Sequence, residues 1–504
     1  ENSRDLVTTC NGYLIAGSTT SNDFDVINNH GATDGWIVKT NGIGELEWTK
    51  TYGGTNGDGI FRIFTTYEGN YFLVGGANSS DGDISNDPYP GTQDYWIVKI
   101  DSLGHILWDK IVGGNGHDQI WTGAVTSDGG VVGFGWTNSE DGDVSVSYGG
   151  TDMWLVKLNS EGMIEWDQTF GGSSLDYGQS IIKTMDKGFL AGGGGRIQGN
   201  GNLTCNSYHG DLDGFLLKLD SLGNIEWQQC YGGSRGESFT GLFELEDGYI
   251  ATGYTDSEDG DVTGWHPGYT EPRNDIWVVK VDFNGNLLWQ RCLGGSRAEY
   301  CSSINQTSDG DLIFTGITQS NDGDVSGNHS NSEHNNDIWM VKLSSEGELL
   351  WQQCFGGVND EKVIFGVIQK TDYRYRIAGQ TAYGPSYDVQ CNYHLGDGAW
   401  PDFWVFEVYD TTVNITETPR DFALKVYPNP ANNYIIFENS VNSKSGATKQ
   451  SPMLTISNTF GQQIAQLEIK DTKTVWDTRQ VNNGVYFYRV TIENTAYSGK
   501  IVIQ

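Results

Sequence analysis

Basic residues are scarce in this sequence. Its 504 residues include 30 Lys+Arg against 65 Asp+Glu, and the formal net charge is −35. Proteins that bind nucleic acid meet the phosphate backbone with clustered Lys and Arg, and no such cluster occurs here. The same shortage argues against docking on an anionic membrane surface. We therefore expect neither nucleic acid nor a membrane surface as a partner.

Long apolar runs are missing too. No run of 18 apolar residues occurs, so we expect no transmembrane segment. The chain opens at Glu1 without the Met, the basic region and the apolar region that a signal peptide contains. We expect that any signal peptide has been removed or left out of this sequence.

Nucleotide-binding signatures are also absent. The sequence has only 8 His and contains no Walker or dinucleotide-binding fingerprint. A carboxylate pair for glycoside hydrolysis stays open, because 65 acidic residues offer too many pairs to choose among. We therefore assign no catalytic residue from the sequence.

Residues 1–410 contain a tandem repeat that is rich in Gly and Trp. An Asp-x-aromatic signature followed by an apolar run recurs in steps of 58 to 65 residues, and a Gly-x-apolar-x-Trp signature that ends in Gly-Gly follows it. The aromatic residues of the first signature are Trp36, Trp96, Trp154, Phe215, Trp277, Trp339 and Trp404, and those of the second are Trp48, Trp108, Trp166, Trp227, Trp289 and Trp351. We expect these aromatics to pack one repeat against the next. Each signature Asp is expected to accept backbone N–H groups where a loop meets a strand.

Each repeat has the pattern of four short strands joined by turns rich in Asp, Ser, Asn and Gly. Four strands per repeat without helical periodicity predict an all-β fold, a β-propeller of seven blades; counts of eight or six are the alternatives. Seven Asp-x-aromatic strands are matched by only six Trp-Gly-Gly strands, so the seventh blade, which ends at residues 404–409, is expected to lack its outer strand. A strand upstream of Glu1 is expected to complete it.

Residues 421–504 differ in character, because they are almost neutral and contain few of the glycines. Their alternating strands predict a small antiparallel β-sandwich that follows a linker at residues 411–420. This segment closely resembles the type A sorting domain of the type IX secretion system of Bacteroidota. The residues that carry the resemblance are Tyr427, Pro428, Asn429, Pro430, Ala431, Asn483, Gly484, Val485, Tyr486 and the terminal Lys500, Ile501, Val502 and Ile503.

The resemblance implies a route rather than an activity. The type IX translocon and the outer-membrane attachment machinery would be the partners, and the protein would be secreted or held at the cell surface. The sorting domain would be removed, and the cargo would be attached to surface lipopolysaccharide. Residues 1–410 look like the Trp- and Gly-rich repeat of surface proteins from the same bacteria, a resemblance that brings no defined activity.

Four of the long loops that precede Asp-x-aromatic strands carry an Asp-Gly-Asp core. The eight carboxylates are those of Asp81, Asp83, Asp141, Asp143, Asp259, Asp261, Asp322 and Asp324. Closely spaced carboxylates with backbone carbonyls suit a hard cation, so these loops are candidate Ca²⁺ sites. The alternative is an acidic surface turn. Recurrence does not decide between them, because repeats copy turns as readily as binding sites.

Three tryptophans outside the two signatures are candidate ligand-binding residues. Trp265 and Trp400 lie in long loops, and Trp136 opens another. Tryptophan beside Asp, Asn and His can stack on sugar rings, which predicts contact with a glycan. Packing within the loops is the alternative.

Cysteine and histidine occur together in two further loops, as Cys205 with His209 and Cys391 with His394. These four residues form a zinc site only if the two loops meet, and a disulfide or plain loop residues are the alternatives. The chain has 7 Cys, an odd number, so at least one thiol is free or pairs with another chain.

The sequence as a whole predicts a secreted, cell-surface binding or adhesion propeller whose acidic loops hold a glycan or a surface protein, with Ca²⁺ as the candidate cofactor. The first rival is an enzyme that acts on polysaccharide through carboxylates on the same face. Acidic residues that converge near the central axis would favour the enzyme, and exposed Trp without such acids would favour binding. The second rival is a structural surface-layer component.

Overall fold

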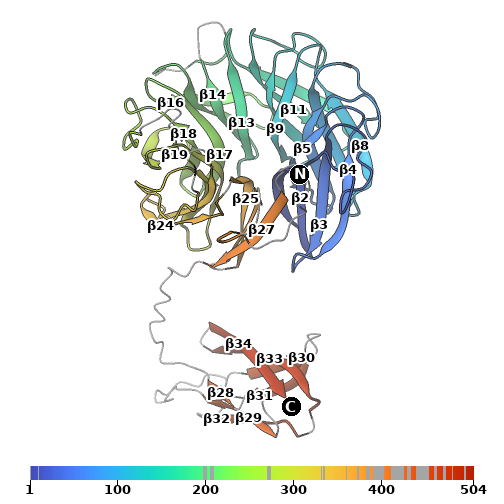
Figure 1. The fold of residues 1–504 in the computed structure, drawn as a ribbon, viewed down its shortest axis with the longest axis vertical. Helices are drawn as coiled ribbons and strands as arrows, with labels where there is room; N and C mark the ends of the chain where they lie inside the picture. Colours follow the sequence, from blue (N-terminus) through green and yellow to red (C-terminus); the bar gives the residue numbers. More distant parts are fainter. Residues whose placement is uncertain are drawn as a thin grey trace. The chain divides into compact units, whose positions relative to one another are not determined.

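Figure 1 shows the computed structural model of the chain. It describes residues 2–9, 11–196, 201–204, 209–268, 274–330, 332, 335–358, 360–371, 374–381, 386–389, 402–409, 425–427, 433–438, 453–458, 463–468, 473–479, 481–492 and 495–503. All the regular structure in these residues is β-strand, which confirms the predicted all-β class. None of them forms a helix long and apolar enough to cross a membrane. The chain divides into two compact units, Glu1–Asp410 (unit 1) and Thr411–Gln504 (unit 2).

The described strands of unit 1 form six antiparallel sheets of four strands and one of three, in chain order. The first sheet contains β1 (Asn2–Thr9), β2 (Gly12–Thr19), β3 (Asp34–Asn41) and β4 (Leu46–Tyr52). The second contains β5 (Gly59–Thr65), β6 (Tyr71–Ala77), β7 (Asp94–Ile100) and β8 (Ile106–Val112). The third contains β9 (Asp118–Val125), β10 (Val131–Thr137), β11 (Asp152–Leu158) and β12 (Ile164–Phe170). The fourth contains β13 (Asp176–Lys183), β14 (Phe189–Gly195), β15 (Asp213–Leu219) and β16 (Ile225–Tyr231).

The fifth sheet contains β17 (Glu237–Leu245), β18 (Gly248–Thr255), β19 (Asp275–Val281) and β20 (Leu287–Leu293). The sixth contains β21 (Glu299–Gln306), β22 (Leu312–Thr318), β23 (Asp337–Leu343) and β24 (Leu349–Phe355). The seventh contains β25 (Glu361–Thr371), β26 (Arg374–Thr381) and β27 (Asp402–Tyr409). Each Asp-x-aromatic signature therefore opens the third strand of its sheet.

The seven sheets contact one another in sequence. The first strand of each sheet packs on that of the next, from β1 on β5 to β21 on β25, and β25 packs in turn on β1. The Ser3 hydroxyl of β1 donates a buried 3.0 Å hydrogen bond to the Gly379 carbonyl oxygen of β26. The Arg376 guanidinium lies 4.3 Å from the centre of the Tyr13 ring. The last sheet of unit 1 is therefore a neighbour of the first (Figure 1).

The signature tryptophans fill the spaces between sheets. Trp96 of the second sheet is fully buried in a core that it shares with Leu14 and Ile37 of the first. The Trp108 ring lies partly exposed, and its Nε1–H donates a 3.0 Å hydrogen bond to the Ser160 carbonyl oxygen of the next sheet. At these positions the prediction that the aromatics pack one repeat against the next is confirmed.

The first strand of each sheet, called here the inner strand, carries a β-bulge. In the first six sheets the pairing with the second strand skips one residue, and the skipped residue stands three positions after the acidic residue that precedes or opens the strand. The skipped residues are Arg4, Phe61, Trp121, Gln179, Thr240 and Ser302. A bulge redirects a side chain relative to a regular ladder, and such bulges are frequent beside functional sites.

Unit 2 contains two antiparallel sheets in the part of it that the structure describes. One has the order β28-β29-β32, from β28 (Lys425–Tyr427), β29 (Tyr434–Glu438) and β32 (Lys473–Asp477). The other has the order β31-β30-β33-β34, from β30 (Met453–Asn458), β31 (Gln463–Glu468), β33 (Gly484–Ile492) and β34 (Thr495–Ile503). Ile435 and Trp476 of the first sheet share one core with Leu454 and Ile501 of the second.

Candidate functional site

The long loops and the Gly-Gly turns of unit 1 meet at one end of the sheets. In the second sheet, the loop between β6 and β7 contacts the turn at Gly53 and Gly54 that leads into β5. The Asp83 N–H donates a 2.9 Å hydrogen bond to the Gly53 carbonyl oxygen, and the Asp83 carboxylate accepts one of 3.2 Å from the Gly53 N–H. The end of the sheets that carries these two kinds of segment is called the loop face below.

The Asp-Gly-Asp cores join the long loops to the Gly-Gly turns. The Asp81 carboxylate accepts a 2.8 Å hydrogen bond from the Thr55 N–H, and Gly82 between the two acids adopts a φ of 70°. A Cβ atom at Gly82 would overlap the Gly53 carbonyl oxygen, so two features favour Gly there. The other three cores contact their turns in the same way, Asp141 and Asp143 at Asn115 and Gly113, Asp259 and Asp261 at Ser234 and Gly232, and Asp322 and Asp324 at Ser296 and Gly294.

These contacts use the carboxylates as acceptors for backbone N–H groups. The Asn115 N–H, for example, holds the pKa of the Asp141 carboxyl below its ordinary value. Among the described residues, no group of three or more His, Cys, Asp or Glu side chains is placed to hold a metal ion. Calcium at these loops stays a prediction, because backbone carbonyl oxygens are further ligands that a hard cation accepts.

Beneath the loop face lies a series of buried carboxyl pairs. Each pair joins the Asp of an Asp-x-aromatic signature to the acidic residue that begins the next repeat, and its members are almost fully buried. A Cβ atom at Gly294 would lie 2.6 Å from the Glu299 carboxyl and 2.8 Å from that of Asp275, so the glycine leaves room for both. The pairs are Asp34 with Asp58, Asp94 with Asp118, Asp152 with Asp176, Asp213 with Glu237, Asp275 with Glu299, and Asp337 with Glu361.

Burial raises the pKa of the carboxyls in the five pairs from Asp94 with Asp118 to Asp337 with Glu361. It raises the pKa of Asp94 to about 8, with the neighbouring Asp118 as the second cause, and that of Asp176 to about 7. Glu299 and Glu361 are also raised to about 7 by burial. In each of the six pairs, one oxygen of the signature Asp is buried without a hydrogen-bond partner, as at Asp275. Two carboxylates this close cannot both ionise at low cost, so a pair that retains one proton is the favourable state.

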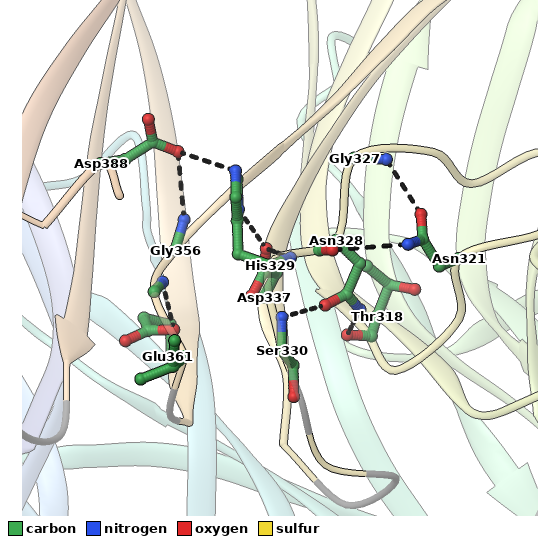
Figure 2. Close-up of polar contacts among 12 residues, drawn as sticks. Thr318, Asn321, Gly327, Asn328, His329, Ser330, Asp337, Gly356, Glu361 and Asp388 are labelled. Atoms are coloured by element: carbon green, nitrogen blue, oxygen red, sulfur yellow. Dashed lines mark hydrogen bonds and ion pairs between the residues drawn. The ribbon is translucent and has the colours of Figure 1, made fainter. Parts of the chain in front are cut away.

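Histidines connect several pairs to the loop face. Figure 2 shows His329 between Asp337, whose carboxyl lies 2.8 Å from Nδ1, and Asp388, whose carboxyl lies 3.8 Å from Nε2. His266 lies in the same way between Asp275 at 2.8 Å and Asp324 at 3.7 Å. The hydrogen bond that the Asp275 carboxylate accepts from the His266 ring raises the pKa of His266. The expected contact between a signature Asp and a backbone N–H is confirmed here, because the His329 N–H donates to Asp337 at 2.9 Å.

A cavity of about 650 Å³ lies among the inner strands of unit 1, near the loop face. Its described lining is mostly apolar and aromatic. Trp121 stacks on Phe61 with ring centres 5.8 Å apart, and Trp136 meets the Tyr177 ring edge-on at 6.2 Å. The polar lining residues are Gln119, Gln179, Ser238, Thr240 and Ser302. An aromatic cavity with a few polar groups is the usual form of a small-molecule site.

Two arginines line the aromatic cavity, and one of them also lines a second cavity of about 470 Å³ among the inner strands. Arg4 lines the first cavity, and Arg62 lines both. The Arg4 guanidinium lies 5.5 Å from the centre of the Phe61 ring, and its Nε is buried without a hydrogen-bond partner. Burial, opposed by the Asp5 carboxylate and assisted by Arg4, lowers the pKa of Arg62 to about 10.

The three predicted tryptophans have different places. Trp136 lines the aromatic cavity. Trp265 lies against Arg235, whose guanidinium is 5.7 Å from the ring centre, and it packs on the core of the fourth and fifth sheets. Trp400 lies outside the described residues. The sequence did not single out Arg4, Arg62 or Tyr177.

The cysteine and histidine predictions are only partly covered by the structure. His209 lies with its Nδ1 3.3 Å from the Asp213 carboxyl, whereas Cys205, Cys391 and His394 lie outside the described residues. Cys230 is disulfide-bonded. The remaining described cysteines, Cys292, Cys301 and Cys354, are free and buried.

The residues of the predicted sorting signal lie in unit 2. Tyr427 ends β28 and pairs with Ile436 of β29. Gly484, Val485 and Tyr486 begin β33 and pair with the end of β34, in which Lys500 stands opposite Phe487. The Tyr486 hydroxyl donates a 2.7 Å hydrogen bond to the Asn482 carbonyl oxygen. Pro428, Asn429 and Pro430 lie outside the described residues.

Comparison with known protein families identifies unit 2. Residues 425–504 match the family described as the secretion system C-terminal sorting domain. The predicted type IX sorting domain is therefore confirmed, and with it export to the cell surface or the surroundings. No curated protein matches the chain.

Solved structures give distant likenesses. PorZ, a surface component of the type IX secretion system of Porphyromonas gingivalis, is 11% identical with a TM-score of 0.29, over 100% of this chain and 70% of that one. A puromycin hydrolase is 10% identical with a TM-score of 0.42, over 90% of this chain and 61% of that one. A polysaccharide lyase, an ulvan lyase, is 9% identical with a TM-score of 0.30, over 87% of this chain and 89% of that one. We draw no functional argument from likenesses at this level.

Proposed function

We propose that this exported chain is a cell-surface binding protein, and that its residues 1–410 form a seven-bladed β-propeller that binds carbohydrate in the aromatic cavity on its axis. The circular order of contacts, from β1 through the other inner strands to β25 and back to β1, supports the propeller. Six four-stranded sheets and a seventh of three, counted among the described strands, support seven blades, the last one short of its outer strand.

The observation that carries the binding function is the composition of the aromatic cavity. Sugar rings present apolar faces that stack on Trp and Tyr, and hydroxyls that hydrogen-bond to amide and hydroxyl side chains. Trp121, Trp136 and Tyr177 supply the first kind of contact, and Gln119 and Gln179 supply the second. The volume of about 650 Å³ suits a ligand of two or three sugar rings.

The lining favours binding over hydrolysis. The described residues around the aromatic cavity include no Asp, Glu or His, so the carboxylate pair of a glycoside hydrolase has no counterpart among them. The numerous buried carboxyls lie under the loop face. There they contact His side chains, backbone N–H groups and one another. The sorting domain implies the type IX secretion machinery as a partner. Binding of Ca²⁺ at the Asp-Gly-Asp loops remains a further proposal.

The test measures binding of neutral and acidic oligosaccharides to the full chain by calorimetry and by tryptophan fluorescence. We expect Trp121→Ala and Trp136→Ala to weaken binding at least tenfold, because each stacking contact is worth about 1 kcal/mol or more. Trp265→Ala removes a tryptophan outside the cavity and is the matched control, expected to bind as the wild type does. Binding that Trp265→Ala weakens and Trp136→Ala does not would refute the cavity as the site. Regular self-association without any sugar binding would favour a surface-layer role.

A further inference from the structure

The charged residues in the described lining of the aromatic cavity are basic, although the molecule as a whole is acidic. The chain as a whole carries −35, yet the charged residues in the described lining of this cavity are Arg4 and Arg62. Both side chains belong to inner strands of neighbouring sheets, β1 and β5, which pack on each other. Two positive side chains are therefore held together on the axis of an otherwise acidic protein.

Among the described residues that line the two cavities, one is acidic. Asp5 lines the second cavity with Arg62, and it accepts backbone hydrogen bonds of 2.8 Å from Ile63 and 2.9 Å from Leu6. These contacts hold the Asp5 carboxylate in place, where it interacts with the Arg62 guanidinium. The described lining of the two cavities therefore contains one acidic side chain and two basic ones, and its net charge is positive.

Arg4 is the side chain that carries this excess. It stands at the bulge of β1, so its side chain points into the aromatic cavity. Its Nε finds no acceptor, and the ring of Phe61 covers one face of the guanidinium. Arg stays charged in proteins, and a partly buried guanidinium with an unsatisfied Nε–H is costly. A carboxylate or sulfate group that approached from the cavity would supply two acceptor oxygens at once.

We propose that the ligand of the aromatic cavity is an acidic carbohydrate, whose carboxylate or sulfate group binds Arg4 while its ring stacks on Trp121 or Trp136. This inference rests on the proposed function and names its ligand class. Arg62, balanced by Asp5, reinforces the positive potential from behind, and the aromatic rings exclude water from the ion pair. A charge-assisted pair in such a setting is worth about 1.5–3 kcal/mol, which is about 10- to 100-fold in affinity.

The test compares ligands that have the same sugar rings and differ in charge. Trigalacturonate and its fully methyl-esterified form have the same rings, and a sulfated galactan oligosaccharide and its desulfated form make the second pair. We expect the full chain to bind one acidic member at least tenfold more tightly than its neutral counterpart. The pair that shows the preference distinguishes a carboxylate from a sulfate ligand.

The matched variants are Arg4→Met, which keeps the length and removes the charge, and Arg4→Lys, which keeps the charge and loses the planar fork. We expect Arg4→Met to abolish the preference for the acidic sugar and leave neutral binding unchanged, and Arg4→Lys to restore part of it. Arg235→Met, outside the cavity, is the control, and thermal melting checks that each variant is folded.

The outcomes separate the two proposals. Equal affinity for acidic and neutral sugars, with binding still dependent on Trp121 and Trp136, would overturn the acidic ligand and keep the carbohydrate site. Absence of binding to all four sugars would overturn both proposals. Binding of an acidic peptide such as oligoglutamate that depends on Arg4, without sugar binding, would overturn the carbohydrate class.

Discussion

Glu299 allows a direct test of whether the buried carboxyl pairs hold protons. It opens β21 and is fully buried. One oxygen accepts hydrogen bonds from the Thr318 hydroxyl at 2.7 Å and the Ser320 N–H at 3.2 Å. The other accepts one of 3.1 Å from the Gly295 N–H. Despite these contacts, burial raises the pKa of the carboxyl from 4.5 to about 7, with the neighbouring Asp275 as a further cause.

The direction of the pH effect follows from this shift. Below pH 4.5 Glu299 is protonated in both the folded and the unfolded chain. Between pH 4.5 and about 7 the unfolded chain releases the proton while the folded chain keeps it, so the free energy of unfolding falls as the pH rises. Each pKa unit corresponds to about 1.4 kcal/mol, so the loss from this one group amounts to about 3 kcal/mol by pH 8. Glu299→Gln has no proton to lose and escapes this loss.

The measurement is urea unfolding of the full chain, followed by tryptophan fluorescence from pH 4.5 to 8 in EDTA. We expect the difference in unfolding free energy between Glu299→Gln and the wild type to shift by about 3 kcal/mol in favour of the variant as the pH rises. Glu258→Gln, at an exposed residue of a loop, is the control and should parallel the wild type. A difference for Glu299→Gln that does not change with pH would refute the protonated pair.

Three further predictions concern the loop face and unit 2. Gly82→Ala should lower the free energy of unfolding by about 1–3 kcal/mol more than Gly69→Ala does. Both glycines have a positive φ, but an added Cβ meets the Gly53 carbonyl only at Gly82. Equal losses of stability in urea unfolding would contradict the contact between loop and turn. Excess Ca²⁺ relative to EDTA should raise the melting temperature by several degrees if the Asp-Gly-Asp loops bind the ion, and Asp322→Asn should reduce that rise; an unchanged melt would leave the loops as acidic turns. Residues 421–504 fused to a neutral cargo should direct its secretion in a host with the type IX system; a fusion protein that stays in the periplasm would contradict the sorting assignment.

The sequence was sufficient for the framework of the fold. Asp-x-aromatic signatures mark the start of third strands such as β7 and β11, and Gly-Gly turns mark the approach to inner strands. These features are local, because alternation and turn residues act within a few positions of the chain. The repeat then supplies the same information six or seven times. The terminal strands of unit 2 were readable for the same reason.

The functional role of particular acids was not readable in this way. The Asp-Gly-Asp cores fitted a cation site and an acidic turn equally well. Their carboxylates accept hydrogen bonds from Thr55 or Asn115, residues 26 positions away along the chain. The buried pairs join residues such as Asp275 and Glu299 across a glycine turn. Contacts of this range depend on how the hairpins stack, which local pattern does not specify.

Of the candidate site, the sequence analysis singled out Trp136 and missed the other lining residues for a related reason, although the sequence held a signal for them. Arg4, Trp121 and Gln179 occupy one repeat position, three residues after the recurring acid, and the bulge turns all of them toward the axis. The residue three positions earlier is acidic in each of these repeats, whereas this position is basic, aromatic or polar. Positions that stay constant build the sheets and their contacts. A position that faces the axis and differs in every repeat has no common structural task, so its differences are available for a ligand. Within a repeat protein, the residues that break the repeat are therefore the ones to examine for binding, and here they point to Arg4 among aromatic rings.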